Sequence, residues 1–391
     1  MKSTRFRFFW QLLDLLFRFL NATARNRVPL GITRLYLVRT HAIGDVLLAT
    51  PVARVIKQAW PRTQITLVVG EKSRVAVDGN PYIDSVESFP EKWWFSKRFG
   101  KILRMTWRLR RKSKDAILLL HASPLIHLWG FLIKAPVRVG FDEEGRGFSL
   151  THKVGRAKTD YDRYLGDVNL DLVRALGVPA ENAVPDFFLR DDELRAARRF
   201  IPPTERTGRP YRIGTAPGGG QNAFEKTCAK HWPVDCYAEL MIQLSKQRDI
   251  QFFLLGDSTD VQTDRVAEKL ANRANVMNLK GKTTFRELAA LIHHLDILIT
   301  NDSSPLHLAV AMNKPVVALF GPTAHWALFP PGPHRIALQS TAPCSPCYTY
   351  GRFPGCPNPT CMAEISVQEV QHAVESILNS ALLARQMKDF E

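Results

Sequence analysis

Residues 300–323 read TNDSSPLHLAVAMNKPVVALFGPT, and this stretch predicts the fold. The apolar run 295–299 just before it and the apolar run 316–320 within it are typical of buried strands. Between the two runs, residues 301–304 are of helix-capping types, and Pro305 suits a first helical turn because no N–H is needed there. We therefore expect a strand, a polar turn and a short helix that leads into a parallel strand.

The turn of this unit carries candidate ligand-binding residues. A helix that begins at the carboxyl end of a parallel strand presents unpaired N–H groups and the positive end of its dipole, which favours a bound phosphate. Asp302, Ser303, Ser304 and His307 are therefore candidates for contact with a phosphorylated ligand. The alternative is an ordinary capped helix in which His307 caps or packs.

The alternation of strand-like and helix-like stretches extends over most of the chain. It begins at residue 32, is interrupted by the Pro-, Gly- and charge-rich stretch IPPTERTGRP at 201–210, and then starts afresh. This pattern predicts an α/β protein with two parallel sheets. We expect domains over 31–200 and 210–365, preceded by a basic segment over 1–30 and followed by a helix over 366–391.

The composition predicts a folded protein with an anionic partner. The 391 residues are 45% hydrophobic, which is enough for packed cores and excludes a disordered chain. The formal net charge is +16 at pH 7. An excess of this size favours nucleic acid, a phosphorylated glycolipid or a membrane surface as the partner.

Residues 1–27 hold the apolar run FRFFWQLLDLLFRFL among basic side chains. Gln11, Asp14 and Arg18 interrupt this run, so it predicts neither a membrane span, which needs about 20 apolar residues, nor a signal peptide. A basic amphipathic helix in the membrane interface fits better. A helix that packs on the protein is the alternative.

A second basic block covers residues 92–114, where ten Lys or Arg side chains alternate with aromatic ones. Single-stranded nucleic-acid binders share this composition, but the chain has no zinc finger, RNP signature or GxxG clamp. We therefore expect a patch that meets anionic headgroups or a phosphorylated acceptor, with no nucleic acid as partner. A solvated helix face is the alternative.

Two further stretches place polar residues where a strand turns into a helix. In HAIGDVLLATPV, at 41–52, Asp45 is either a helix cap or a carboxylate that accepts a proton from a sugar hydroxyl. In APGGGQNAFEKTCAKHWP, at 216–233, Gly218 and Gly219 allow close approach of a ligand. Lys230 is either a surface lysine or the cation that neutralises a diphosphate.

Candidate metal ligands are few. Asp160 and Asp162 form a two-carboxylate pattern, but they lie in a charged stretch with no apolar strand before it, so we expect no catalytic metal there. The cysteines at 344–361 form one compact cluster, for which a structural zinc ion, reduced thiols and disulfides are the alternatives. Its members are Cys344, Cys347, Cys356 and Cys361.

Together, Gly44-Asp45, the KHWP stretch at 230–233 and the turn at 302–307 resemble glycosyltransferase family 9, the lipopolysaccharide heptosyltransferases. The resemblance covers residues 32–374 and implies a GT-B fold, that is, two Rossmann-like domains facing across a cleft. It implies that Asp45 is the catalytic base and that the amino-terminal domain binds the acceptor.

The resemblance also implies roles in the carboxyl-terminal domain. There, Lys230 contacts the donor diphosphate, and the turn with Asp302, Ser303, Ser304 and His307 binds donor sugar and phosphates. An acidic residue after the strand at 252–256 contacts the nucleotide ribose in this family, and Asp257 and Asp260 both compete for that role.

The resulting hypothesis is an inverting glycosyltransferase that needs no metal and transfers heptose from ADP-heptose to a lipopolysaccharide core acceptor. Such an enzyme would sit peripherally on the cytoplasmic face of the inner membrane. The alternatives are a related transferase with a hexose or N-acetylhexosamine donor, and a non-catalytic protein that binds nucleotides or nucleic acid.

Overall fold

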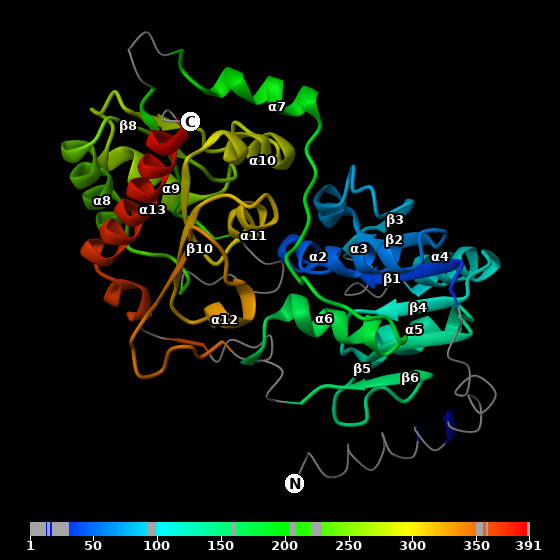
Figure 1. The fold of residues 1–391 in the computed structure, drawn as a ribbon. Helices are drawn as coiled ribbons and strands as arrows, with labels where there is room; N and C mark the ends of the chain where they lie inside the picture. The colour runs from blue at the N-terminus through cyan, green and yellow to red at the C-terminus, as the bar shows by residue number, and fades with distance from the viewer. Residues whose placement is uncertain are drawn as a thin grey trace. The chain divides into compact units, whose positions relative to one another are not determined.

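The computed structural model describes residues 31–91, 99–157, 162–203, 209–219, 229–348, 355–356 and 359–388, together with Leu13, Leu16 and Phe17. The chain divides into two compact units, Met1–Asp186 and Phe187–Glu391. Each unit contains one six-stranded parallel sheet with helices packed on it (Figure 1). The predicted α/β class with two parallel sheets is confirmed.

The first unit is organised around a fully parallel sheet in the order β3-β2-β1-β4-β5-β6. Apolar runs such as AILL at 116–119 are buried along their whole length, as expected for strands covered on both faces. The strands are β1 (Arg34–Arg39), β2 (Gln64–Gly70), β3 (Ser85–Phe89), β4 (Ala116–Leu119), β5 (Val137–Asp142) and β6 (His152–Gly155).

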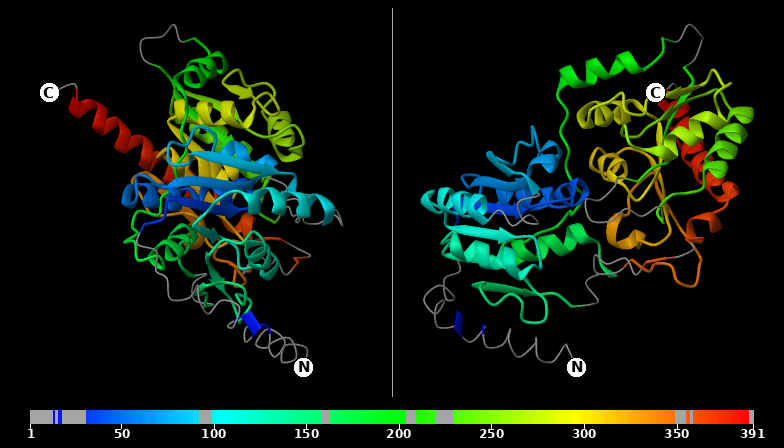
Figure 2. Two further views of the ribbon diagram at one scale, coloured as in Figure 1. Left: turned by 90° about the vertical axis from the view of Figure 1, so that its right-hand side faces the viewer. Right: turned by 180° about the vertical axis from the view of Figure 1, so that it is seen from behind.

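Helices connect these strands and cover the sheet (Figure 2). Side chains of the central strands, among them Val38 and Leu119, pack with Leu109 and Trp129 from the covering helices to form the core. The helical elements are α2 (Ile43–Leu47), α3 (Thr50–Ala59), η1 (Glu71–Ala76), α4 (Phe99–Arg111), α5 (Pro124–Leu132) and α6 (Leu165–Arg174).

The second unit has a sheet in the order β12-β11-β10-β7-β8-β9, again fully parallel. Its core combines residues of the central strands with Trp232, Tyr237 and the apolar face of the last helix. The strands are β7 (Tyr211–Ala216), β8 (Ile250–Leu254), β9 (Val276–Asn278), β10 (Ile297–Asn301), β11 (Val316–Phe320) and β12 (Arg335–Gln339).

The helical elements of the second unit include the predicted helix at the carboxyl end, which is described up to residue 388. Val370, Val374 and Ile377 bury one face of this helix in the core. The elements are α7 (Asp191–Ala197), η4 (Arg198–Phe200), α8 (Val234–Gln247), α9 (Val261–Lys269), α10 (Phe285–His294), α11 (Ser304–Ala311), α12 (His325–Leu328), η5 (Cys361–Glu364) and α13 (Val367–Lys388).

The division between the units falls after Asp186, whereas composition placed it at 201–210. The difference arises because α7 packs on α10 and so joins the second unit. Arg286 of α10 binds the carboxylate of Glu193 through its Nε and through Nη2 at 2.7 Å, and the ring of His294 bonds the Leu194 carbonyl at 2.8 Å. Pro, Gly and charge mark a loop, but side-chain contacts decide the unit to which a helix belongs.

The stretch at 300–323 forms the predicted strand, helix and strand, as β10, α11 and β11. The first strand begins two residues later than expected, at Ile297, and continues to Asn301. Its residues Leu298–Asn301 pair in parallel with Val316–Leu319 of β11.

Both sheets share one topology. In each unit the first strand lies in the centre of the sheet beside the fourth strand. The second and third strands extend the sheet to one edge, and the fifth and sixth extend it to the other. The pairs are β1 with β4 and β7 with β10. Sheets with this strand order bind ligands where the order reverses, at the carboxyl ends of the central strands. We call this place the switch point of each unit.

Candidate functional sites

At the switch point of the first unit, Arg39 ends β1 and Asp45 lies in the first turn of α2. The guanidinium of Arg39 binds the Asp45 carboxylate, with Nη2 at 2.7 Å from Oδ2. Its Nη1 donates to the carbonyl of Leu120, just after β4. Arg39 thus ties the ends of both central strands to the candidate base.

Asp45 is not the cap of its helix. The N-cap of α2 is Ala42, which adopts the uncommon positive φ of 59° and makes no side-chain cap hydrogen bond. The Asp45 carboxylate bonds Arg39 instead and keeps 32% of its side-chain surface exposed. The capping interpretation therefore does not describe this residue, and a solvent-accessible carboxylate is left at the switch point.

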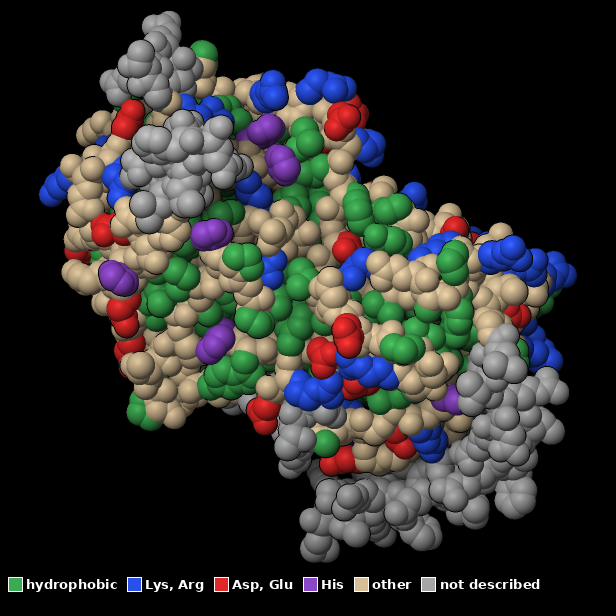
Figure 3. All heavy atoms as spheres, in the orientation of Figure 1, with side chains coloured by type: hydrophobic (Ala, Val, Ile, Leu, Met, Phe, Trp, Pro, Cys, Tyr) green, Lys and Arg blue, Asp and Glu red, His purple; other side chains and the backbone are tan. Residues whose placement is uncertain are grey.

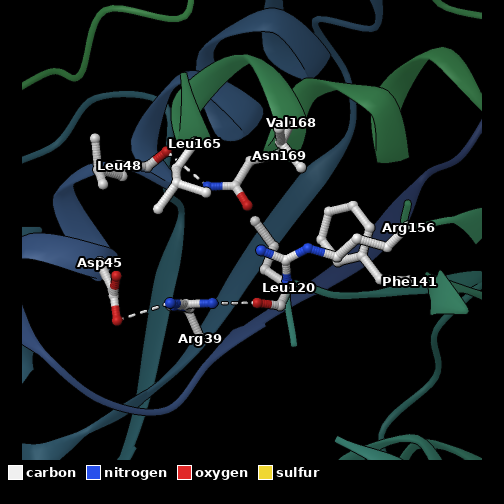
Figure 4. Close-up of a pocket in the computed structure, with 9 residues that line it drawn as sticks. All are labelled: Arg39, Asp45, Leu48, Leu120, Phe141, Arg156, Leu165, Val168 and Asn169. Carbon is white, nitrogen blue, oxygen red and sulfur yellow. Dashed lines mark hydrogen bonds and ion pairs between the residues drawn. The ribbon is translucent and has the colours of Figure 1, made fainter. Parts of the chain in front are cut away.

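A cavity of about 60 Å³ opens beside this ion pair (Figure 4). Its polar groups come from Arg39, Asp45, Arg156 and Asn169, and its apolar wall comes from five further side chains. The complete lining is Arg39, Asp45, Leu48, Leu120, Phe141, Arg156, Leu165, Val168 and Asn169.

The buried His121 and the half-buried His41 adjoin this site, and sequence reasoning did not single them out. Nε2 of His121 accepts a hydrogen bond from the Thr40 backbone N–H at 2.9 Å, and the His41 ring centroid lies 5.4 Å from that of His121. Burial and, secondarily, the charge of Arg39 lower the pKa of both histidines. His121 directly follows the apolar run at 116–120, which is the signal that marks it in the sequence.

At the switch point of the second unit, Lys230 and Asp302 form the corresponding ion pair. The ammonium of Lys230 lies 2.6 Å from Oδ2 of Asp302, which follows β10. Nε2 of His307, on α11, lies 4.0 Å from the other carboxylate oxygen. The structure therefore brings together three of the predicted site residues.

Asp302 is buried, with 7% of its side chain exposed, whereas Lys230 retains 21%. Burial raises the pKa of the Asp302 carboxyl, but the charges of Lys230 and His307, together with hydrogen bonds from Lys230 and Thr323, hold the pKa below its usual value. Asp302 is therefore an anion, and its partner Lys230 is the more accessible member of the pair.

The turn after β10 is held by a buried network. Asn301 donates from Nδ2 to the Pro217 carbonyl at 2.7 Å and accepts from the hydroxyl of Tyr237 at 3.1 Å. Trp232 packs edge-on against Tyr237 and donates to the Ile365 carbonyl at 2.8 Å. The tryptophan in the KHWP stretch thus anchors the loop that carries Lys230.

Two predicted residues lie at the start of α11. Ser303 is the N-cap, but it makes no side-chain cap hydrogen bond and its Oγ instead lies 3.1 Å from the Thr300 hydroxyl. Ser304 is the first residue of the helix, and a proline occupies the first turn as predicted. The expectation that capping side chains satisfy this turn is wrong for Ser303.

Protein side chains occupy the space beside Gly218 and Gly219, the two glycines predicted to admit a ligand. A Cβ atom on Gly218 would lie 2.0 Å from a carboxylate oxygen of Asp260, and one on Gly219 would lie 3.2 Å from the ring of His231. Gly218 therefore admits the Asp260 carboxylate, which caps α9 by accepting from the backbone N–H groups of residues 262 and 263. Asp257 is exposed and accepts from Thr259. Of the two acids, Asp260 is the one that adjoins the switch point.

The described cysteines are free, and Cys236 lies apart from the cluster in sequence. Burial and the neighbouring cysteines raise the pKa of the Cys347 and Cys361 thiols. Among the residues that the structure describes, no three His, Cys, Asp or Glu side chains are grouped to hold a metal ion. All four clustered cysteines are described, and as arranged they do not form a ligand set.

The cysteine loop nevertheless contributes to the second site. The backbone N–H groups of Cys347 and Tyr348 both donate to the Pro322 carbonyl, at 2.9 and 2.7 Å. The ring centroid of Tyr348 lies 5.1 Å from Nζ of Lys230. Sequence reasoning missed this cation–π contact because the two residues are far apart in the chain.

Several predicted features lie outside the described residues, namely most of the segment 1–30, residues 92–98 of the basic block, and Asp160. Asp162 is described and exposed. Within the described parts of the chain, no helix is both long and apolar enough to cross a membrane.

Two Rossmann-like units, each with a cation–carboxylate pair at its switch point, are the architecture expected of a two-domain α/β protein with the GT-B fold. The family described as "Glycosyltransferase family 9 (heptosyltransferase)" matches residues 102–355, more than half of the chain. The chain belongs to this family and is a glycosyltransferase.

Known proteins agree with this assignment. The chain is 23% identical to the lipopolysaccharide core heptosyltransferase OpsX of Haemophilus influenzae over 296 residues, which cover 73% of this chain and 78% of that protein. A family 9 glycosyl transferase from Veillonella parvula superposes with a TM-score of 0.74 at 23% identity, covering 90% and 98% of the two chains. The E. coli ADP-heptose lps heptosyltransferase II superposes with a TM-score of 0.70 at 21% identity, covering 89% and 99%. The predicted GT-B fold is thereby confirmed.

Proposed function

We propose that this glycosyltransferase transfers heptose from ADP-heptose to an acceptor of the lipopolysaccharide core, with inversion at the anomeric carbon. The names of similar proteins, OpsX and heptosyltransferase II, support the donor and the acceptor. The observation that carries the mechanism is the opposite exposure of the two ion pairs, which offers a carboxylate in the first unit and an ammonium in the second.

In the proposed reaction, Asp45 accepts the proton of an acceptor hydroxyl while the oxygen of that hydroxyl attacks the anomeric carbon of the donor. The bond between that carbon and the diphosphate oxygen breaks, and ADP leaves with the electron pair. Attack opposite the leaving group inverts the configuration. Arg39 holds the carboxylate through Oδ2 and so orients it for this step.

The second unit stabilises the charge that develops on ADP. Lys230 exchanges part of its contact with Asp302 for the diphosphate, and the backbone at the start of α11, near Ser303 and Ser304, adds the positive end of the helix dipole. His307 adjoins the same turn. These groups supply the electrostatic stabilisation that other enzymes obtain from a metal, so we propose transfer that does not require one.

We further propose that the first unit binds the cytoplasmic surface of the inner membrane, where an amphiphilic acceptor resides. On α4, Leu103 and Trp107 are 67% and 55% exposed and stand one helical turn apart among basic side chains. Figure 3 shows Lys and Arg side chains gathered at the right-hand edge of the molecule, where Figure 1 has α4. Apolar anchors among arginines are typical of helices that lie in the interface.

The described part of the amino-terminal segment supports the same surface. Phe17 is buried and packs edge-on against Phe131 of α5, with ring centroids 4.9 Å apart, and α5 contacts α4. Its neighbour Leu16 is 55% exposed. Phe17 fits the alternative of a helix packed on the protein, and the exposed Leu16 beside it fits an interfacial role.

The proposal is tested with the purified full chain and a panel of nucleotide sugars. We expect ADP-heptose and ADP to raise the melting temperature, because a ligand that binds only the folded state stabilises it. ADP-glucose and UDP-N-acetylglucosamine serve as comparisons. Mass spectrometry then follows transfer to a core acceptor with and without EDTA. Stabilisation by UDP sugars alone, with no heptose transferred, would contradict the donor, and loss of transfer on chelation would contradict metal independence.

A further inference from the structure

A second cavity, of about 180 Å³, lies in the second unit away from its switch point. It adjoins the amino ends of β7 and β10 and the loop before β11, where Tyr211, Ile297 and Pro315 form part of the wall. The switch point lies at the opposite, carboxyl end of these strands, roughly 13 Å away along the five residues of β10. The proposed transfer reaction therefore leaves this cavity unused.

Much of the wall of this cavity is apolar. Leu295 and Ile297 come from the start of β10, and Ile377 and Leu378 come from α13. All four side chains are almost completely buried. A cavity of about 150 Å³ with a comparable lining holds a benzene molecule in another protein. The second cavity is thus large enough for a ring or a short aliphatic chain.

The lining also contains one acid, Asp296, and one lysine, Lys314. The acid is already paired within the protein. Arg209 binds both carboxylate oxygens of Asp296, at 2.7 and 2.8 Å, and the backbone N–H of Arg212 donates to Oδ2 at 2.8 Å. The charge that remains to be balanced at the cavity is therefore that of Lys314.

The backbone fixes the place of Lys314. Asn313 ends α11 with a positive φ of 52°, and the N–H of Lys314 donates to the Ala309 carbonyl at 2.8 Å, in the pattern of a Schellman turn. Pro315 follows and favours an extended backbone at the residue before it. The side chain thus starts from a defined point on the wall of the cavity.

The ammonium of Lys314 is half-buried, and among the residues that the structure describes no side chain or carbonyl accepts a hydrogen bond from it. Burial lowers the pKa of this ammonium, and the nearby charge of Asp296 raises the pKa only in part, because Arg209 acts in the opposite direction. A half-buried cation in this state is stabilised by an anion placed beside it.

We propose that this cavity binds a small monocarboxylate whose apolar part is about the size of a benzene ring. The carboxylate pairs with the Lys314 ammonium, and the ring or chain contacts Leu295, Ile297 and the two residues of α13. One unbalanced positive charge favours a ligand with one negative charge, whereas a phosphate monoester carries about two at pH 7. Because the site lies at the opposite strand ends from Lys230, the second unit can hold this ligand and a nucleotide together.

The experiment uses the purified full chain and probes that separate charge from apolar contact. Ligand-detected NMR titrations give the affinity for benzoate, for benzyl alcohol, which has the ring without the charge, and for acetate, which has the charge without the ring. We expect saturable binding of benzoate, about tenfold or more tighter than that of either comparison. Phenyl phosphate should bind more weakly than benzoate, and ADP should not displace benzoate.

Variants assign the charge to Lys314. Lys314→Gln should weaken benzoate binding about 10- to 100-fold, the range of a hydrogen bond to a charged group, and should leave benzyl alcohol unaffected. Lys314→Arg should retain most of the affinity for benzoate. The control Lys246→Gln, which removes an exposed lysine of α8, should match wild type.

The wild-type probes keep the proposal falsifiable even if a variant fails to fold. Equal wild-type affinity for benzoate and benzyl alcohol would overturn the proposal, as would displacement of benzoate by ADP or tighter binding of phenyl phosphate. Unchanged benzoate affinity in a folded Lys314→Gln protein would also overturn it. None of these measurements involves sugar transfer, so their outcome is independent of the proposed function.

Discussion

The two units of this enzyme place opposite chemistry on the same scaffold. Each has the same strand order, and each carries a cation–carboxylate pair at its switch point. In the first unit the carboxylate of Asp45 is the more exposed partner, at 32% against 19% for Arg39. In the second unit the ammonium of Lys230 is the more exposed, at 21% against 7% for Asp302. Which partner is buried therefore decides whether the site offers a base or a cation.

Local structure explains the difference. Asp45 lies on a five-residue helix after the turn, so its carboxylate reaches back to the strand end and remains open to solvent. Asp302 lies in the turn itself, between the buried Asn301 and the start of α11, so Lys230 must reach inward from a separate loop. Residues of the same types thus acquire different roles from their position relative to the strand end.

The largest expected effect is that of Asp45→Asn. Asparagine can still accept the hydrogen bond from Arg39 but cannot accept a proton, so the transfer rate should fall about 10²- to 10⁴-fold with little change in melting temperature. Initial rates at saturating donor and acceptor measure this. The matched control is Asp78→Asn, which alters a surface acid paired with Arg74 in the same unit and should retain full activity. Turnover of Asp45→Asn at the wild-type rate would show that the first unit does not supply a catalytic base through Asp45.

The second effect concerns the exposed cation. Lys230→Gln keeps a donor for Asp302 but removes the charge, so kcat/KM should fall about 10²- to 10³-fold and ADP should bind more weakly. Steady-state kinetics and calorimetry with ADP measure the two quantities. Lys246→Gln, an exposed lysine in the last turn of α8, is the control. Normal ADP affinity and normal rates in the Lys230 variant would exclude the lysine from the donor site.

The buried acid should matter for stability. Removing one partner of a buried pair is costly, so Asp302→Asn should destabilise the protein by about 1–3 kcal/mol at neutral pH. Because the folded-state pKa of Asp302 is lowered, its contribution is present above the unfolded pKa, about 4, and is lost as the pH falls through the lower folded value. The difference in melting temperature between wild type and variant should therefore shrink below about pH 4.

A second acid provides the comparison for that measurement. Asp264 pairs with Lys280 in the same unit but is 44% exposed. Asp264→Asn should lower the melting temperature far less, because exposed pairs contribute little. Equal shifts for the two variants at all pH values would show that burial does not distinguish Asp302.

Much of the fold follows from the sequence, because strand length and apolar runs are local signals. The runs at 116–119 and 316–320 are buried strands because parallel sheets are covered on both faces. The boundary between the units did not follow, since it depends on the ion pair of Glu193 with Arg286, more than 90 residues away in the chain. Composition cannot reveal such a contact.

The sites were predictable to a similar extent. Residue type and position at a strand end pointed to Asp45, Lys230 and Asp302, and the latter two are joined in the structure. Arg156 gave no signal, because it follows the short strand HKVG, which lacks an apolar pattern. Side-chain partners such as Tyr348 for Lys230 depend on how loops return to the sheet, which spacing does not encode.

The smallest expected effect concerns the outer surface of the first unit. It shows whether the difference between the two units includes a membrane-binding surface on α4. On α4, Arg111 stacks on Trp107 with its Cζ 3.4 Å from the ring centroid, and Arg108 binds Glu87, as does Lys112 directly after the helix. These contacts hold basic groups beside the exposed tryptophan. Replacing both Leu103 and Trp107 by serine should therefore reduce binding to anionic vesicles about tenfold, because the interface loses apolar area while the charge is kept.

Vesicle co-sedimentation at two salt concentrations measures this loss. The control is Val261→Ser, which removes an exposed apolar side chain of the second unit, 59% exposed, and should leave vesicle binding unchanged. Transfer to a water-soluble acceptor fragment should be normal in the α4 variant, since the switch point is intact. If the α4 variant binds vesicles like wild type and deletion of residues 1–27 abolishes binding, membrane binding depends on the amino-terminal segment and not on α4. The difference between the two units would then not include α4.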